Sequence, residues 1–131
     1  MLFALLLTVA LAALAVFQLA LALGAPLGRY AWGGAHRTLP ARLRIGSAIS
    51  ILLYAVIALI AWDRVGGVDL FAETFSVVAM WVIFGYFALG ILMNAISRSK
   101  RERYTMVPVT LVLAALALLI ALGYGELAVA A

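Results

Sequence analysis

The chain contains four long apolar stretches, and almost all of its positive charge lies in two of the three connections between them. The stretches cover residues 2–23, 44–62, 71–96 and 106–122. Each is close to the ~20 residues with which a helix crosses a hydrocarbon core of ~30 Å, at a rise of ~1.5 Å per residue. A soluble helix needs only one apolar face, so stretches that are apolar on every side predict four membrane spans.

The composition leaves little room for anything besides these spans. Of 131 residues, 69% are hydrophobic and 11% are charged, whereas a soluble domain is about half apolar and a quarter charged. We therefore predict an all-α membrane protein, an antiparallel four-helix transmembrane bundle that forms one domain over residues 1–131. The abundance of Ala, Leu and Arg beside a single Lys is typical of a GC-rich bacterial genome and suggests a bacterial inner membrane.

The distribution of charge predicts the orientation. Basic residues crowd the first and third connections, whereas the second is mostly acidic: Arg29, Arg37, Arg42 and Arg44; Arg98, Lys100, Arg101 and Arg103; Arg64 with Asp63, Asp69 and Glu73. Short loops rich in Lys and Arg stay on the cytoplasmic side. We expect these two connections inside and both termini outside. Orientation also explains the sequence pI of about 10.0 without a nucleic-acid partner.

Small and polar residues recur in every span at steps of three and four, which places them on one face of each helix. Such residues mark helix–helix contacts in a bilayer, because lipid competes equally well for Leu. We expect these faces to point inward: Thr8, Ala12, Ala15, Gln18 and Ala22; Ser47, Ser50, Tyr54, Ala58 and Ala61; Ser76, Ala79, Ile83, Tyr86, Gly90 and Asn94; Thr110, Ala114, Ala117 and Ala121.

A candidate binding site lies at the end predicted to be cytoplasmic. Hydrogen-bonding side chains gather in that half of the spans, and basic residues lie just beyond them: Gln18, Ser47, Ser50 and Asn94, then Arg29, His36 and Arg44. One interpretation is that these polar groups bond to one another and hold the bundle together, at roughly 1 kcal/mol or less per bond. The other is a pocket in which Arg side chains bind an anionic lipid headgroup or a small anion.

The first connection is long for a helical bundle and contains both Tyr30 and Trp32 among its glycines and prolines. Aromatic rings of this kind favour the membrane interface. We interpret this connection as lying on the cytoplasmic leaflet or dipping into it, and the sequence leaves open which of the two occurs.

Several kinds of chemistry have no support. The chain has no cysteine, which excludes disulfides and thiolate catalysis. No charged residue lies mid-span, where ion-coupled transporters usually keep one. His36 has no partner at metal-ligand or triad spacing. A separate expectation concerns Pro108, which we place in the first turn of the fourth helix. We predict no cofactor and no metal site.

These absences favour a protein that is not an enzyme, with two alternatives open. One is a small transporter or channel subunit that acts as a homo-oligomer. The other is a membrane-embedded lipid-modifying enzyme, for which His36, Asp63 and Asp69 are the realistic acids and bases.

Several short motifs resemble a group of small bacterial membrane proteins with four spans and no assigned activity. They are Gly24-Ala25-Pro26-Leu27-Gly28, Trp32-Gly33-Gly34, Leu43-Arg44-Ile45-Gly46-Ser47, Asn94 with Ser97-Arg98-Ser99, and Glu102-Arg103. The resemblance implies four spans and a bacterial inner membrane. It implies no ligand and no catalytic residue.

Overall fold

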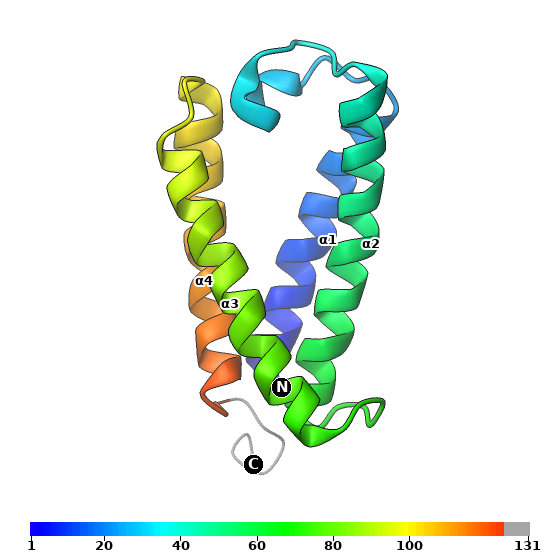
Figure 1. Ribbon diagram of the computed structural model, residues 1–131, viewed down its shortest axis with the longest axis vertical. Helices are drawn as coiled ribbons and strands as arrows, with labels where there is room; N and C mark the ends of the chain where they lie inside the picture. The colour runs from blue at the N-terminus through cyan, green and yellow to red at the C-terminus, as the bar shows by residue number, and fades with distance from the viewer. Residues whose placement is uncertain (125–131) are drawn as a thin grey trace.

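The computed structural model describes residues 1–124, which form four long helices joined by short connections (Figure 1). The helices are α1 (Leu2–Ala22), α2 (Ala41–Arg64), α3 (Glu73–Ala95) and α4 (Lys100–Ala121), and the first connection holds two short turns, η1 (Gly28–Tyr30) and η2 (Trp32–Gly34). Each long helix is long and apolar enough to cross a membrane. The predicted four-helix bundle is confirmed. The predicted side of the C-terminus concerns residues 125–131, which lie outside the described part of the chain.

Helix α4 begins at Lys100, well before the fourth apolar stretch. The Ser99 side chain caps it by accepting a hydrogen bond from the Glu102 N–H at 3.3 Å. Lys, Arg and Glu are good helix formers, so the helix includes a polar first turn that hydropathy does not detect. The expected position of Pro108 is therefore wrong: it lies inside α4, where its ring cannot donate to the carbonyl of Tyr104.

The bundle consists of two helical hairpins, α1–α2 and α3–α4, that pack closely at one end only (Figure 1). We call this the closed end; it carries residue 1 and the α2–α3 connection. The opposite, basic end carries the first and third connections. Most of the buried apolar core lies in the closed half, where it comprises Ala4, Leu7, Leu11, Ile57, Ile60, Ala61, Val65, Met80, Ile83, Phe87, Leu113, Ala114, Leu116, Ala117, Ile120 and Ala121.

Hydrogen bonds fasten the closed end. The carboxylate of Asp63 accepts from the N–H groups of Leu70 and Phe71 at 2.6 and 2.8 Å, and from the Ser76 hydroxyl at 2.5 Å. The indole of Trp62 donates to the Thr8 hydroxyl at 2.9 Å. Asp63 thus holds the α2–α3 turn, and Trp62 ties α1 to α2.

The predicted inward faces are partly right. In α4 the small residues Ala114, Ala117 and Ala121 are buried as expected. Ala12 of α1 and Tyr86 of α3 are exposed instead. In α1 the buried positions are mainly leucines, whereas the polar Thr8 and Gln18 form hydrogen bonds with side chains of α2.

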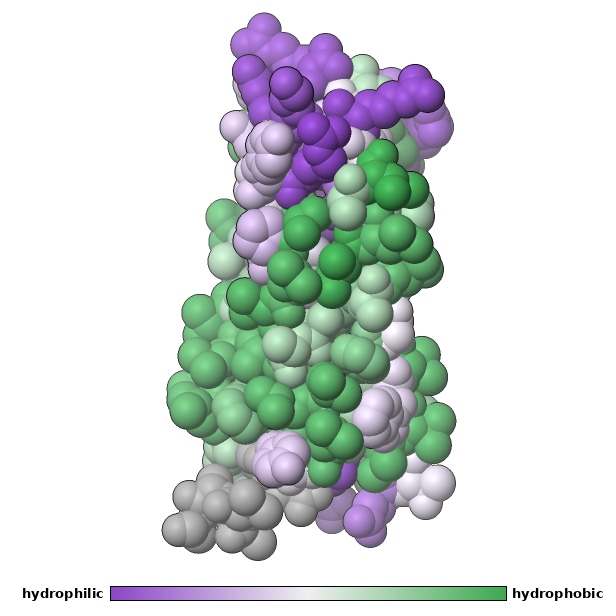
Figure 2. All heavy atoms as spheres, turned by 90° about the vertical axis from the view of Figure 1, so that its left-hand side faces the viewer, coloured by the Kyte–Doolittle hydropathy of each residue, from purple (hydrophilic) through white to green (hydrophobic). Residues whose placement is uncertain are grey.

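The surface divides into bands along the bundle axis. Figure 2 shows a wide apolar zone over the helices and a cluster of hydrophilic residues at the basic end. Many large apolar side chains are exposed in the zone, among them Leu52, Val82 and Leu89. A monomeric soluble protein rarely exposes apolar surface on this scale, so a bilayer is the natural solvent for this zone.

Candidate functional site

The first connection is a folded cap, by which we mean residues 24–40. Gly28 donates its N–H to the Arg37 carbonyl at 2.8 Å, which brings the two ends of the cap together. A Cβ on Gly28 would lie 2.2 Å from the carbonyl oxygen of His36, so only glycine permits this approach. The cap is therefore a defined structure and not a loose linker.

Trp32 anchors the cap to α2. Its indole N–H donates to the Ser47 hydroxyl at 3.0 Å, and its ring packs against Gly46, where a Cβ would lie 2.8 Å from the ring. Trp32 has a φ of 53°, an unfavourable backbone conformation for a bulky residue. The hydrogen bond to the buried Ser47 and the close ring contact with Gly46 hold the residue in this conformation.

A second set of contacts anchors the cap to α4. The Gly33 N–H donates to the buried carboxylate of Glu102 at 3.1 Å, and the Ser99 hydroxyl donates to the Arg29 carbonyl. Gly34 lies so close to Ser99 that an added Cβ would come within 2.2 Å of the serine Cβ. The cap consequently bridges the two hairpins at the end where the helices themselves are less tightly packed.

A basic pocket lies between the cap and the start of α4. It has a volume of ≈ 500 Å³ and is lined by Arg29, Gly33, Gly34, Ala35, Arg98, Ser99, Lys100 and Arg101. Four of these residues are cations and none is acidic; Glu102 is not in the lining, and its carboxylate is bonded to the cap backbone.

Backbone groups add to the positive potential of this pocket. The N–H groups of Lys100 and Arg101 lie in the first turn of α4, where no intrahelical acceptor exists for them. The partial positive charge of a helix N-terminus favours anions. The cationic side chains and the helix N-terminus therefore both contribute positive potential to the pocket. The pocket is chemically suited to a phosphate or carboxylate group.

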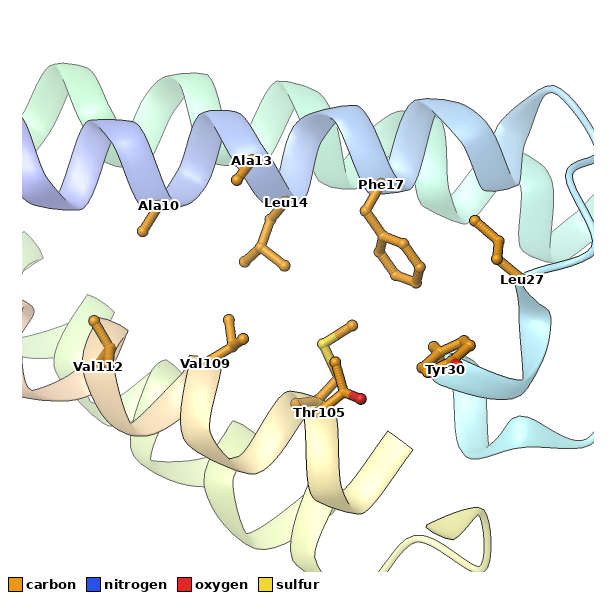
Figure 3. Close-up of a pocket in the computed structure, with 10 residues that line it drawn as sticks. Ala10, Ala13, Leu14, Phe17, Leu27, Tyr30, Thr105, Val109 and Val112 are labelled. Carbon is orange, nitrogen blue, oxygen red and sulfur yellow. The ribbon is translucent and has the colours of Figure 1, made fainter. Parts of the chain in front are cut away.

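An apolar groove of ≈ 520 Å³ lies next to the basic pocket, between α1 and α4 (Figure 3). Its lining comes from α1, the cap and α4: Ala10, Ala13, Leu14 and Phe17; Leu27 and Tyr30; Thr105, Met106, Val109 and Val112. In Figure 3, Leu14 and Phe17 point across the groove toward α4, and Tyr30 lies at its basic end. Ala13, Thr105 and Val112 are exposed, so the groove is open along one side.

The candidate site residues of α1 and α2 lie on one side of the bundle. Gln18 donates to the Tyr54 hydroxyl at 3.2 Å, and Ser50 bonds back to the Gly46 carbonyl. The Ser47 hydroxyl accepts the hydrogen bond from the Trp32 indole. Arg44 donates to the carbonyl of Ala22 at 2.9 Å, across the end of α1. These side chains mainly join α1, α2 and the cap.

The other candidate residues are separated from that group. Asn94 interacts with Thr110 across the α3–α4 hairpin at 3.4 Å. The His36 imidazole makes no hydrogen bond or ion pair within residues 1–124. Arg29 donates to the Gly34 carbonyl at 2.7 Å and is the one candidate that lines the basic pocket. Of the seven residues, only Arg29 lines either the basic pocket or the apolar groove of the described chain.

In the sequence, Arg98, Lys100 and Arg101 indicated only the orientation of the bundle, and no pattern indicated the groove. The Ser99-x-x-Glu102 spacing was an available signal, because it is a capping-box pattern that predicts a helix start beside those basic residues. The groove has no sequence signature of its own. It depends on how far α1 and α4 separate, and periodicity does not encode that distance.

No protein-family model, curated protein or solved structure matches the chain. Within residues 1–124, no three His, Cys, Asp or Glu side chains come together as metal ligands. The chemistry of the basic end is accordingly the guide to function.

Proposed function

We propose that this chain is a multi-pass protein of the bacterial inner membrane that binds an anionic lipid headgroup, or a small anion of the same chemistry, at its cytoplasmic end. The observation that carries the proposal is the basic pocket, in which four cations and the N-terminus of α4 surround a cavity with no acidic residue in its lining. Basic pockets on the cytoplasmic side of helical membrane proteins are a known means of binding lipid headgroups.

The geometry favours binding over catalysis. Arg29 is held by the Gly34 carbonyl, and the glycines at positions 33 and 34 bring backbone close to the pocket. Arginine offers a planar pair of donors that matches a phosphate bidentately. No carboxylate and no histidine lines the pocket to transfer a proton to or from a bound group. In this proposal Ser47, Arg44 and Glu102 support the cap that shapes the pocket.

A titration tests the proposal. Purified protein in a neutral detergent is titrated with dihexanoyl phosphatidylglycerol, and with dihexanoyl phosphatidylcholine as the uncharged comparison. We expect the anionic lipid to bind more tightly. Replacing both Arg98 and Arg101 with Gln should weaken its binding about 30-fold, at about 1 kcal/mol per cation near a membrane surface.

The matched control is the double variant Arg37→Gln with Arg42→Gln. Both residues are exposed and lie in or beside the cap, yet neither lines the basic pocket. The two double variants therefore lower the net charge equally. Equal weakening by both would mean that diffuse surface charge attracts the lipid, and the proposed site would be wrong.

A further inference from the structure

The groove between α1 and α4 and the basic pocket are lined by neighbouring residues of the same two elements. Arg29 lines the pocket and the next residue, Tyr30, lines the groove; both belong to η1. On α4, Arg101 lines the pocket and Thr105, one turn further along, lines the groove. A molecule with a charged part and an apolar part can therefore occupy both spaces at once.

The groove is confined to one half of the bundle. Its α1 residues lie between positions 10 and 17 and its α4 residues between 105 and 112. Each range corresponds to roughly 10 Å along a helix at ~1.5 Å per residue, less than the ~15 Å of one leaflet. Beyond it, the helices close on Leu7 and Leu113 of the buried core. The groove thus occupies the leaflet whose surface carries the basic pocket.

The lining is apolar where hydrocarbon would lie. Eight of its ten residues have no polar side-chain atom, and the other two, Tyr30 and Thr105, lie in the part near the basic end. Its ≈ 520 Å³ is within the range of ~300–1,000 Å³ that is usual for ligand sites. Its open side faces the bilayer, which permits lateral entry of a chain without passage through water.

We infer that the groove holds a hydrocarbon chain of the same anionic phospholipid whose phosphate occupies the basic pocket. The inference rests on the proposed function and adds to it: the ligand is a whole lipid gripped at both its charged and apolar parts, and not a free anion. Tyr30 and Thr105 would lie at the level of the glycerol backbone, between the cations and the apolar lining.

Photocrosslinking tests this inference. The protein is reconstituted in phosphatidylcholine nanodiscs with a trace of phosphatidylglycerol that carries a diazirine in one acyl chain, and crosslinked residues are mapped by mass spectrometry. We expect crosslinks to concentrate on α1 and α4 around Phe17 and Val109. Excess unlabelled phosphatidylglycerol should compete, and glycerol phosphate at equal concentration should compete at least tenfold less well.

A pair of variants at adjacent positions of α1 provides the control, because consecutive residues of a helix point in different directions. Ala13→Phe fills the groove from its rim, whereas Ala12→Phe places the same ring on the neighbouring exposed position outside it. We expect Ala13→Phe to reduce the lipid crosslinks to α1 and α4 at least fivefold and Ala12→Phe to leave them unchanged. Both positions are exposed, so neither substitution should disturb the core.

The outcomes separate this inference from the proposed function. Crosslinks spread evenly around the bundle, or equal competition by glycerol phosphate, would overturn the groove while leaving the headgroup site intact. Groove crosslinks that persist unchanged in the Arg98→Gln and Arg101→Gln double variant would overturn the headgroup site and its link to the chain. Protein–protein crosslinks from a photoreactive residue at position 13 would show that a second copy fills the groove and would also overturn the inference.

Discussion

At the scale of single residues, the cap depends on two glycines, because neither position readily accepts a side chain. Gly33 and Gly34 both have a left-handed backbone, with φ of 79° and 71°. A Cβ on Gly33 would meet nothing within 4 Å, whereas one on Gly34 would collide with Ser99. Alanine at position 33 therefore tests the free-energy cost of the backbone conformation alone. Alanine at position 34 tests that cost together with the cost of a steric clash.

This difference gives a matched prediction. Gly33→Ala should destabilise the protein by about 1–2 kcal/mol through the backbone alone. Gly34→Ala should cost a further ~1–3 kcal/mol, because the cap must move away from α4. Unfolding in mixed micelles measures both values, and tryptic cleavage within the cap, near Arg29 and Arg37, reports its release. Equal stability and equal cleavage in the two variants would show that the cap does not pack on Ser99 as described.

At the closed end, Asp63 holds the α2–α3 turn through its hydrogen bonds. Asp63→Ala removes the acceptor for two backbone N–H groups and for the buried Ser76 hydroxyl. We expect a loss of about 2–3 kcal/mol in the free energy of unfolding, because hydrogen bonds to a charged group are the stronger ones.

Asp69→Ala is the control. Asp69 is exposed and makes no hydrogen bond within the described residues, so its removal should change stability by less than about 0.5 kcal/mol. Similar losses in both variants would contradict the assigned role of Asp63.

At the scale of elements, hydropathy and charge predicted the helices and missed the cavities. The four spans follow from their apolar length, and the polar start of α4 was missed because Lys100–Arg103 resembles a loop in composition. The hydrogen-bonding partners of Gln18 and Asn94 could not be deduced, since they depend on which hairpin each helix joins. Trp32 and Gly46 were both noted as motif residues, and their contact connects two of the motifs.

The motif residues share a structural explanation. Trp32 bonds to Ser47, Gly33 to Glu102, and Gly34 packs on Ser99. Each pair joins the cap to a helix start. These contacts give the motif residues a structural role in closing the basic end of the bundle.

At the scale of the whole molecule, the orientation of the bundle decides in which leaflet the proposed site would lie. The first and third connections lie at one end and the α2–α3 connection at the other (Figure 1). Because the chain has no cysteine, Thr38→Cys and Asp69→Cys each introduce a unique label site on an exposed residue. In spheroplasts, a membrane-impermeant maleimide should label Asp69→Cys at once and Thr38→Cys only after lysis. The reverse pattern would place the basic end outside and contradict the positive-inside assignment.

If the basic end binds anionic phospholipid as proposed, the protein should keep such lipid through purification. The protein is extracted in a mild detergent, purified, and analysed by native mass spectrometry beside the lipid extract of the same membranes. We expect the retained lipid to be enriched in anionic phospholipid over the bulk membrane. This enrichment should be lost in the Arg98→Gln and Arg101→Gln double variant but kept when Arg37 and Arg42 are replaced. Retained lipid in bulk proportion, or the same enrichment in all three proteins, would contradict the proposal.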